Sequence, residues 1–187
     1  MITIDFAALR SGQKTYAEII RGVSYQDLFQ ITSEFFDTIQ TSIAPATDAD
    51  VTFVPNDPDA RETEGVGWTL GHVVAHFTAS LEESAALAAM LARGVTVEGR
   101  LRYETPWETI QTVQQVQSRL AESRRMSEAF LNAWPETPHL DVTVTRVPTF
   151  GPLNAIGAYL LGILHGQAHV EQVREIMRQA GQSPKHT

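Results

Sequence analysis

Two pairs of histidines, each with a four-residue spacing, are the side chains of this sequence most suited to chemistry. His165 and His169 lie in the segment GILHGQAHVEQV, and His72 and His76 lie in GHVVAHF. In a helix this spacing places both members of a pair on one face, one turn apart. The sequence contains no cysteine, so any metal must be held by His, Asp or Glu. Neutral imidazole is a common ligand of divalent ions, and the two pairs are therefore candidate ligands.

Charged residues indicate which way His165 and His169 point. At about 100° per residue, they share a helical stripe with residues that are mostly apolar, namely Ala158, Leu161, Gly162, Gln172 and Ile176. The opposite side of the helix carries Gln167, Glu171, Arg174 and Arg178. Because a charged side faces solvent, both histidines are predicted to face the protein interior.

His72 and His76, the other pair, differ in their expected exposure to solvent. His76 borders the apolar stripe of its helix, whereas His72 lies in the first turn, where solvent access is expected. For one isolated pair, ordinary packing or partial exposure is more common than metal binding. Two pairs on different helices favour a metal site, because buried imidazoles need partners and a divalent cation satisfies several of them at once.

Competing catalytic motifs are absent. No HExxH sequence is present, and the one Glu-x-x-His run, Glu136 to His139, contains Pro138 and is expected to be a loop. The paired Glu-x-x-His of a carboxylate-bridged di-iron bundle is therefore missing. The glycines form no phosphate-binding fingerprint, and no serine lies in a nucleophile-elbow pattern.

Helical periodicity and capping residues predict four long helices, at about 24–43, 69–93, 105–134 and 152–181. The third helix has the clearest predicted start, with Thr105 as N-cap, Pro106 in the first helical position and Glu108 completing a capping box. Ser24 and Asp27 form a similar N-cap pair for the first helix. A shorter helix is expected at about 5–21.

These helices predict an all-α fold, a four-helix bundle formed by one domain over residues 1–187. The long loops are expected to carry at most short strands, with VTFV (51–54) and DVTVTRV (141–147) as the candidates. The link at about 94–104 is long enough to run the length of the second helix. A crossover that makes helices two and three parallel is therefore feasible, although loop lengths alone leave the topology open.

Aromatic residues are expected to pack. The three tryptophans, Trp68, Trp107 and Trp134, are assigned to packing, and helical spacing makes Phe35, Phe77 and Phe130 core candidates. Arg102 and Tyr103, just before the predicted third helix, could rim a pocket, but an ordinary loop is the preferred interpretation.

Composition limits the class of protein. The 187 residues are 43% hydrophobic and 19% charged, as in globular proteins, and no run approaches the roughly 20 apolar residues of a membrane span. The N-terminus lacks the order of residues of a signal peptide, so a soluble cytoplasmic protein is expected. The formal net charge is −8 and no basic tract is present, so neither nucleic acid nor membrane is an expected partner.

Two segments make the chain resemble the DinB/YfiT-like superfamily of metal-binding four-helix bundles. One is WTLGHVVAHF, in which a tryptophan precedes a histidine by eight residues, and the other is HGQAHVEQV, in which two histidines four apart are followed by Gln and an aliphatic residue. Carried over by position, the superfamily's metal triad falls on His76, His165 and His169. His72 then falls where relatives often carry a polar or acidic residue, and Glu171 stands where a glycine is common.

The resemblance also implies a crossover up-down-down-up topology, frequent homodimerisation and a divalent metal, zinc or nickel first, then iron or manganese. Because characterised relatives include transferases that use low-molecular-weight thiols, the expected function is a metal-dependent small-molecule transferase of the thiol S-transferase type, or a hydrolase. His72, Gln172 and Glu83 are candidate supporting residues, although a solvated surface position is the favoured interpretation of Glu83. The alternative is a non-catalytic binding or dimerisation module with a structural metal or none, so enzymatic activity itself is left open.

Overall fold

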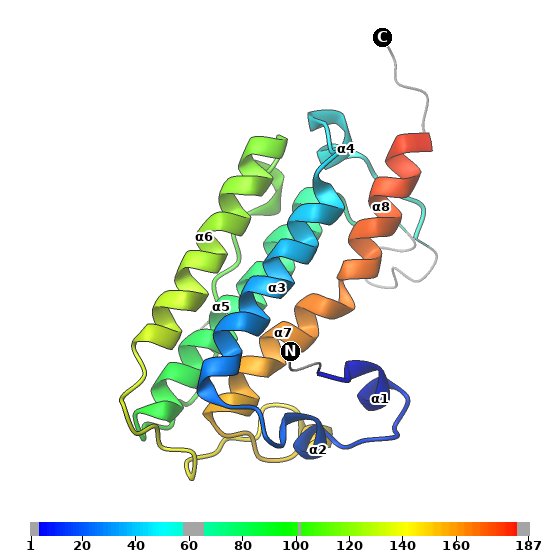
Figure 1. Ribbon diagram of the computed structural model, residues 1–187. Helices are drawn as coiled ribbons and strands as arrows, with labels where there is room; N and C mark the ends of the chain where they lie inside the picture. The colour runs from blue at the N-terminus through cyan, green and yellow to red at the C-terminus, as the bar shows by residue number, and fades with distance from the viewer. Residues whose placement is uncertain (1–3, 58–65, 101, 183–187) are drawn as a thin grey trace.

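A bundle of long α-helices dominates the computed structural model, which describes residues 4–57, 66–100 and 102–182 (Figure 1). The long helices are α3 (Tyr25–Ile43), α5 (Leu70–Ala92), α6 (Val113–Asn132), α7 (Ala155–Ala168) and α8 (Val170–Gln182). The colours in Figure 1 show α3 and the α7–α8 pair running in one direction, and α5 and α6 in the other. The prediction of an all-α bundle with parallel second and third helices is therefore confirmed.

The predicted bounds of the first two long helices are confirmed. At the start of α3, Ser24 Oγ accepts a hydrogen bond from the Asp27 backbone N–H, and the Asp27 carboxylate accepts the Ser24 N–H at 2.7 Å. Thr69 caps α5 through the His72 backbone N–H. After α5, Gly94 adopts a positive φ of 80°, which a residue with a side chain rarely tolerates and which stops the helix.

The third helix begins later than predicted. Trp107–Thr109 forms only a 3-10 helix, η2, and α6 starts at Val113 with Thr112 as its N-cap. Between them Ile110 has extended backbone angles, φ −99° and ψ 92°, and its side chain is buried against the core. Burial of Ile110 therefore outweighs the local capping signal at Thr105.

The fourth helix and the N-terminal helix are each divided in two. A turn at His169 separates α7 from α8, whereas the sequence predicted one helix over 152–181. At the N-terminus, α1 (Phe6–Arg10) and α2 (Tyr16–Ile20) replace the single helix expected at 5–21, because Thr15 and Glu18 form a new capping box.

The candidate strands are not formed within the described residues. Half of the segment 51–54 belongs to the short helix α4 (Asp48–Thr52), and the segment 141–147 contributes only an isolated bridge between Val144 and Leu153. A second 3-10 helix, η3 (Pro148–Phe150), follows this bridge.

Apolar side chains from all the long helices form a continuous core. Phe35 of α3 and Phe77 of α5 meet edge to face with ring centroids 5.8 Å apart, and Trp134 stacks on Tyr25, while Phe130 packs half-buried against the core. The packing predicted for these residues is therefore confirmed. None of the helices in the described parts of the chain is long and apolar enough to cross a membrane.

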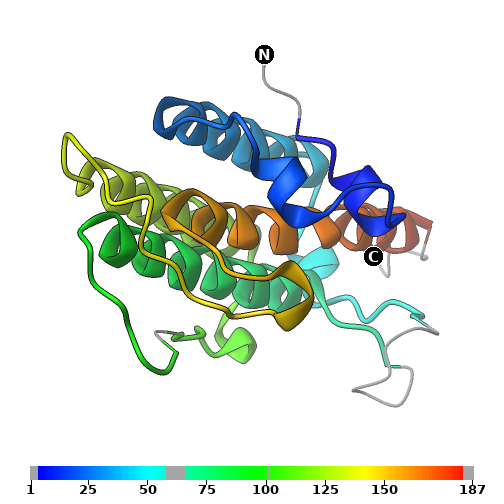
Figure 2. The ribbon, with the colours of Figure 1, turned by 90° about the horizontal axis from the view of Figure 1, so that it is seen from below.

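Two long connections cover one side of the bundle. Figure 2 shows the segment between α5 and α6 (93–112) on the side of α5 that faces away from α3, and the segment between α6 and α7 (133–154) crossing in front of α5 and α7. Residues far from the histidines in sequence therefore reach the same side of the molecule.

Candidate metal centre

His76, His165 and His169 converge where α5 meets the junction of α7 and α8. One ring nitrogen from each histidine lies within 4.8 Å of the others, and the Nε2 atoms of His165 and His169 are 3.3 Å apart. His76 contributes from the second turn of α5, His165 from the last turn of α7, and His169 from the turn that follows. The predicted fourth helix is thus interrupted at His169, but His169 still lies beside the other two histidines.

Close packing of α5 against α7 brings the histidines together. A Cβ atom added at Gly162, one turn before His165, would lie 2.7 Å from Ser84 Cβ and 3.1 Å from Leu81 Cα. Real Cβ atoms do not approach other atoms so closely, so the absence of a side chain at Gly162 lets the two helices touch.

Gln172 fixes the orientation of His169. Its Oε1 atom lies 2.7 Å from His169 Nδ1, and because an amide oxygen only accepts hydrogen bonds, Nδ1 carries the proton. This leaves the lone pair of Nε2 directed toward the neighbouring imidazoles. The sequence placed Gln172 on the same stripe, and the structure places it in contact.

Arg102, from the connection between α5 and α6, closes the other side of the cluster. Its Nη2 atom donates to the His76 carbonyl at 3.1 Å and lies 3.3 Å from His76 Nδ1. The same guanidinium binds the Glu104 carboxylate at 2.5 Å and contacts Ser80 Oγ. The preferred interpretation of Arg102 as part of an ordinary loop was therefore wrong, whereas Tyr103 is exposed.

All three imidazoles are held in the neutral form. Burial, followed by the charges of neighbouring histidines, lowers the pKa of His76 and of His165 to about 4. Burial also lowers the pKa of His169, partly offset by its hydrogen bond to Gln172. Neutral imidazole is the form that binds metal ions, so the cluster presents three donors without first losing protons.

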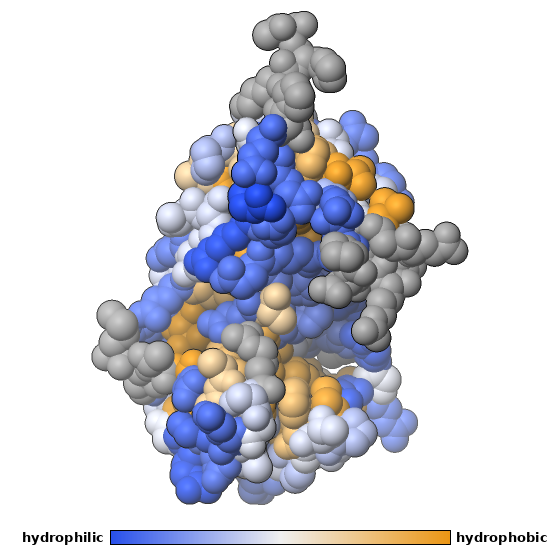
Figure 3. Space-filling view, turned by 90° about the vertical axis from the view of Figure 1, so that its right-hand side faces the viewer, coloured by the Kyte–Doolittle hydropathy of each residue, from blue (hydrophilic) through white to orange (hydrophobic). Residues whose placement is uncertain are grey.

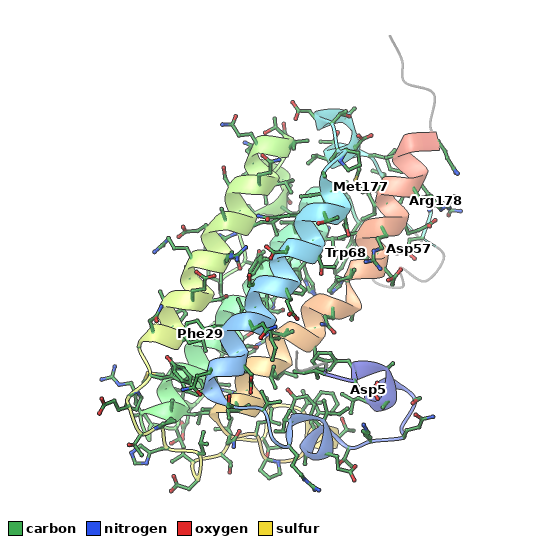
Figure 4. All side chains as sticks on the ribbon, in the orientation of Figure 1. Asp5, Phe29, Asp57, Trp68, Met177 and Arg178 are labelled. Atoms are coloured by element: carbon green, nitrogen blue, oxygen red, sulfur yellow. The ribbon has the colours of Figure 1, made fainter. Side chains whose placement is uncertain are left out.

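His72 lies outside the cluster and is stacked between two tryptophans. Its ring centroid is 4.2 Å from that of Trp68 and 4.8 Å from that of Trp107, with nearly parallel planes. Trp68, labelled in Figure 4, also meets His76 at 4.8 Å. The assignment of Trp107 to packing is confirmed by its stacking on His72, although the side chain is 37% exposed.

The outer face of α8 is polar, as the sequence predicted. Glu171, Arg174 and Arg178 are exposed, whereas Gln167 at the end of α7 is half-buried. Figure 4 shows Arg178 pointing away from the bundle and Met177 on the side toward it. In Figure 3, hydrophilic side chains cover the upper centre of the face on which α8 lies.

A cavity of about 680 Å³ opens beside the histidines. Its lining is mixed in chemistry and comes from α5, α7 and both long connections: His76, Ser80, Glu83, Ser84, Leu87, Arg100, Arg102, Glu104, Thr145, Arg146, Val147, Leu161 and His165. Sequence reasoning missed Arg100, Glu104 and Arg146, because no periodic pattern links loop residues to a distant helix. Glu83 lies in this wall and binds Arg100 through two hydrogen bonds of 2.8 and 2.5 Å, so the favoured interpretation of Glu83 as a solvated surface residue was wrong.

Comparison with known proteins identifies the class to which this fold and site belong. The family model of the DinB superfamily matches residues 28–173, a range that runs from the first turn of α3 to the first turn of α8 and contains the three clustered histidines. The chain therefore belongs to the DinB superfamily. No curated protein and no solved structure matches it. The extent of the domain, predicted as 1–187, stays a prediction.

Proposed function

We propose that the protein binds one divalent metal ion through His76, His165 and His169 and acts on small molecules as a metal-dependent transferase of the thiol S-transferase type, or as a hydrolase. The observation that carries this proposal is the convergence of three neutral imidazoles, two of which, His76 and His165, line a cavity of about 680 Å³. Cavities of this size accommodate small-molecule ligands.

The donor set fits a transition-metal ion. Three imidazole nitrogens within 4.8 Å of one another suit zinc or nickel, and iron or manganese less well. Three protein ligands leave a coordination position open, as in catalytic rather than structural zinc sites. Bound there, the ion would supply Lewis acidity and lower the pKa of a coordinated water or thiol.

The chain's own residues would orient the ligands and hold the substrate. Gln172 fixes His169, and Arg102 fixes the backbone of α5 at His76. Leu87 and Leu161 offer apolar contact in the cavity, and Ser80 and Ser84 offer hydroxyl groups. This arrangement supports a binding site for a substrate that is partly apolar and partly polar.

The test begins with metal content. Protein purified without a histidine tag or chelating resin is expected to carry about one divalent ion per chain, and His165→Ala is expected to lose it. His139→Ala is the matched control, because His139 lies outside the cluster and is half exposed. Absence of metal after reconstitution with zinc and with nickel would exclude the proposal.

Catalysis is then tested with the metal-loaded protein. Turnover of 1-chloro-2,4-dinitrobenzene with a panel of thiols, and of activated esters without thiol, is expected in the wild type and not in His165→Ala. If the metal stabilises the fold but neither reaction occurs, the alternative of a non-catalytic module is supported instead. Homodimerisation is part of the same proposal and is measured by light scattering.

A further inference from the structure

One guanidinium group in the cavity has no carboxylate partner. The lining contains three arginines, Arg100, Arg102 and Arg146, but only two carboxylates, Glu83 and Glu104. Arg100 binds Glu83, and Arg102 binds Glu104. Within the described residues, Arg146 forms no ion pair, and its one hydrogen bond runs from Nη2 to the Val97 carbonyl at 3.1 Å.

The unpaired charge is a local exception in an acidic protein. The chain has a formal net charge of −8, yet the cavity wall carries one more cation than anion. The imidazoles do not alter this balance, since they are neutral. Arg146 helps Arg100 and Arg102 to lower the pKa of Glu83, but it forms no direct ion pair with Glu83, whose two carboxylate oxygens both accept hydrogen bonds from Arg100.

The bond to Val97 leaves Arg146 able to bind a ligand. Val97 packs against the core, so its carbonyl gives the guanidinium a fixed anchor. A guanidinium has five N–H donors in a planar fork, and a paired set of them matches the two oxygens of a carboxylate or phosphate. Arg146 is half-buried, where such a pairing is screened less by solvent than at the surface.

We propose that the small-molecule substrate carries an anionic oxygen group, a carboxylate or a phosphate, which binds Arg146 in the cavity wall while the reacting end of the molecule faces the histidine cluster. The position of the reacting end rests on the proposed function. The recognition of the anion by Arg146 does not require a bound metal.

The test uses full-length protein freed of metal by dialysis against a chelator. Butyrate, methyl phosphate and the neutral butyramide are added separately, and their binding is followed by ligand-observed NMR. At least one of the two anions is expected to bind about tenfold more tightly than butyramide. The anion that does so identifies the group as a carboxylate or a phosphate, and equal binding of all three probes would overturn the proposal.

Variants distinguish anion binding by Arg146 in the cavity from a general effect of the protein's charge on anion binding. Arg146→Gln is expected to remove the preference for the anion, whereas Arg146→Lys, which keeps the charge, is expected to retain part of it. Arg174→Gln removes the same charge from the exposed face of α8 and should leave the preference intact. A preference that survives Arg146→Gln, or that Arg174→Gln abolishes equally, would contradict recognition by Arg146. Zinc binding is measured on the same samples, so failure of the metal site and failure of the anion site are distinguishable.

Discussion

The three clustered imidazoles have few hydrogen-bond partners for groups so largely buried. His169 has Gln172, His76 has Arg102, and His165 has only the Nε2 atom of His169, among the described residues. A buried polar group without a good partner costs about 1–3 kcal/mol, so the fold tolerates an arrangement that a shared cation would relieve. At the scale of the residue, the cluster is costly for stability and suited to metal binding.

Histidine spacing explains why this part of the site could be predicted from the sequence. The four-residue interval of His165 and His169, with Glu171 and Arg174 on the opposite side, determines the direction of both imidazoles without any knowledge of the fold. Arg146 has no such local pattern, because its place in the cavity that His165 also lines depends on how the connection 133–154 crosses the bundle. Its role became visible only in three dimensions.

The contact between Gln172 and His169 predicts a measurable loss of metal affinity. Gln172→Ala removes the acceptor that holds Nδ1–H, so the imidazole can rotate or change tautomer, and zinc affinity is expected to fall about 10- to 100-fold. Competition with a fluorescent chelator measures this change. Gln167→Ala, which removes a similar side chain outside the cluster, is the control, and equal affinity of Gln172→Ala and wild type would contradict the role assigned to Gln172.

A capping pair predicted the start of one long helix, whereas a similar signal misplaced the start of another. Ser24 lies directly before a helix, as its pairing with Asp27 predicted, and the structure agrees. Thr105, Pro106 and Glu108 carry the clearest signal in the chain, but only a single 3-10 turn follows them, and beyond it the backbone is extended at Ile110, whose side chain is buried in the core. Local sequence therefore specifies where a helix can begin, and tertiary burial selects among the candidates.

Two threonine variants test which cap starts α6. Thr112→Ala removes a capping interaction with the Gln115 N–H and is expected to lower the free energy of unfolding by about 1 kcal/mol. Thr105→Ala removes only a long 3.4 Å contact with Arg119 and is expected to have a smaller effect. Urea denaturation of both variants measures the difference, and a larger loss for Thr105→Ala would restore the start predicted from the sequence.

The close approach of α5 and α7 at Gly162 predicts that a side chain at this position lowers the stability of the bundle. Gly162→Ala places a Cβ within 2.7 Å of Ser84 Cβ, so the helices must separate, and the free energy of unfolding is expected to fall by about 1–3 kcal/mol. Gly181→Ala, in α8, meets nothing within 4 Å and should be neutral or slightly stabilising. Because Gly162 lies one turn before His165, Gly162→Ala should also weaken zinc binding. An unchanged free energy of unfolding in Gly162→Ala would argue against tight packing of α5 against α7 at this position.

At the scale of the whole molecule, the crossover topology assembles the cavity. Parallel α5 and α6 require the connection 93–112 to return along the length of the bundle, and this passage carries Arg100, Arg102 and Glu104 to α5 (Figure 2). The helical pattern of the sequence predicted a four-helix bundle and was compatible with a crossover connection. The resemblance to the DinB/YfiT-like superfamily indicated the up-down-down-up topology. Which loop side chains meet the histidines depends on non-local packing that periodicity does not encode.

A metal held by α5 and the α7–α8 junction would couple the stability of the whole bundle to metal concentration. An ion that binds only the folded state at about 100 times its dissociation constant stabilises it by about 2.7 kcal/mol. For a chain of this size, that corresponds to an increase in Tm of roughly 5–10 °C. Thermal unfolding with and without zinc is expected to show this increase for the wild type and for His139→Ala, but not for His76→Ala. An equal shift in His76→Ala would mean that zinc binds elsewhere, since this variant removes the one ligand that α5 provides.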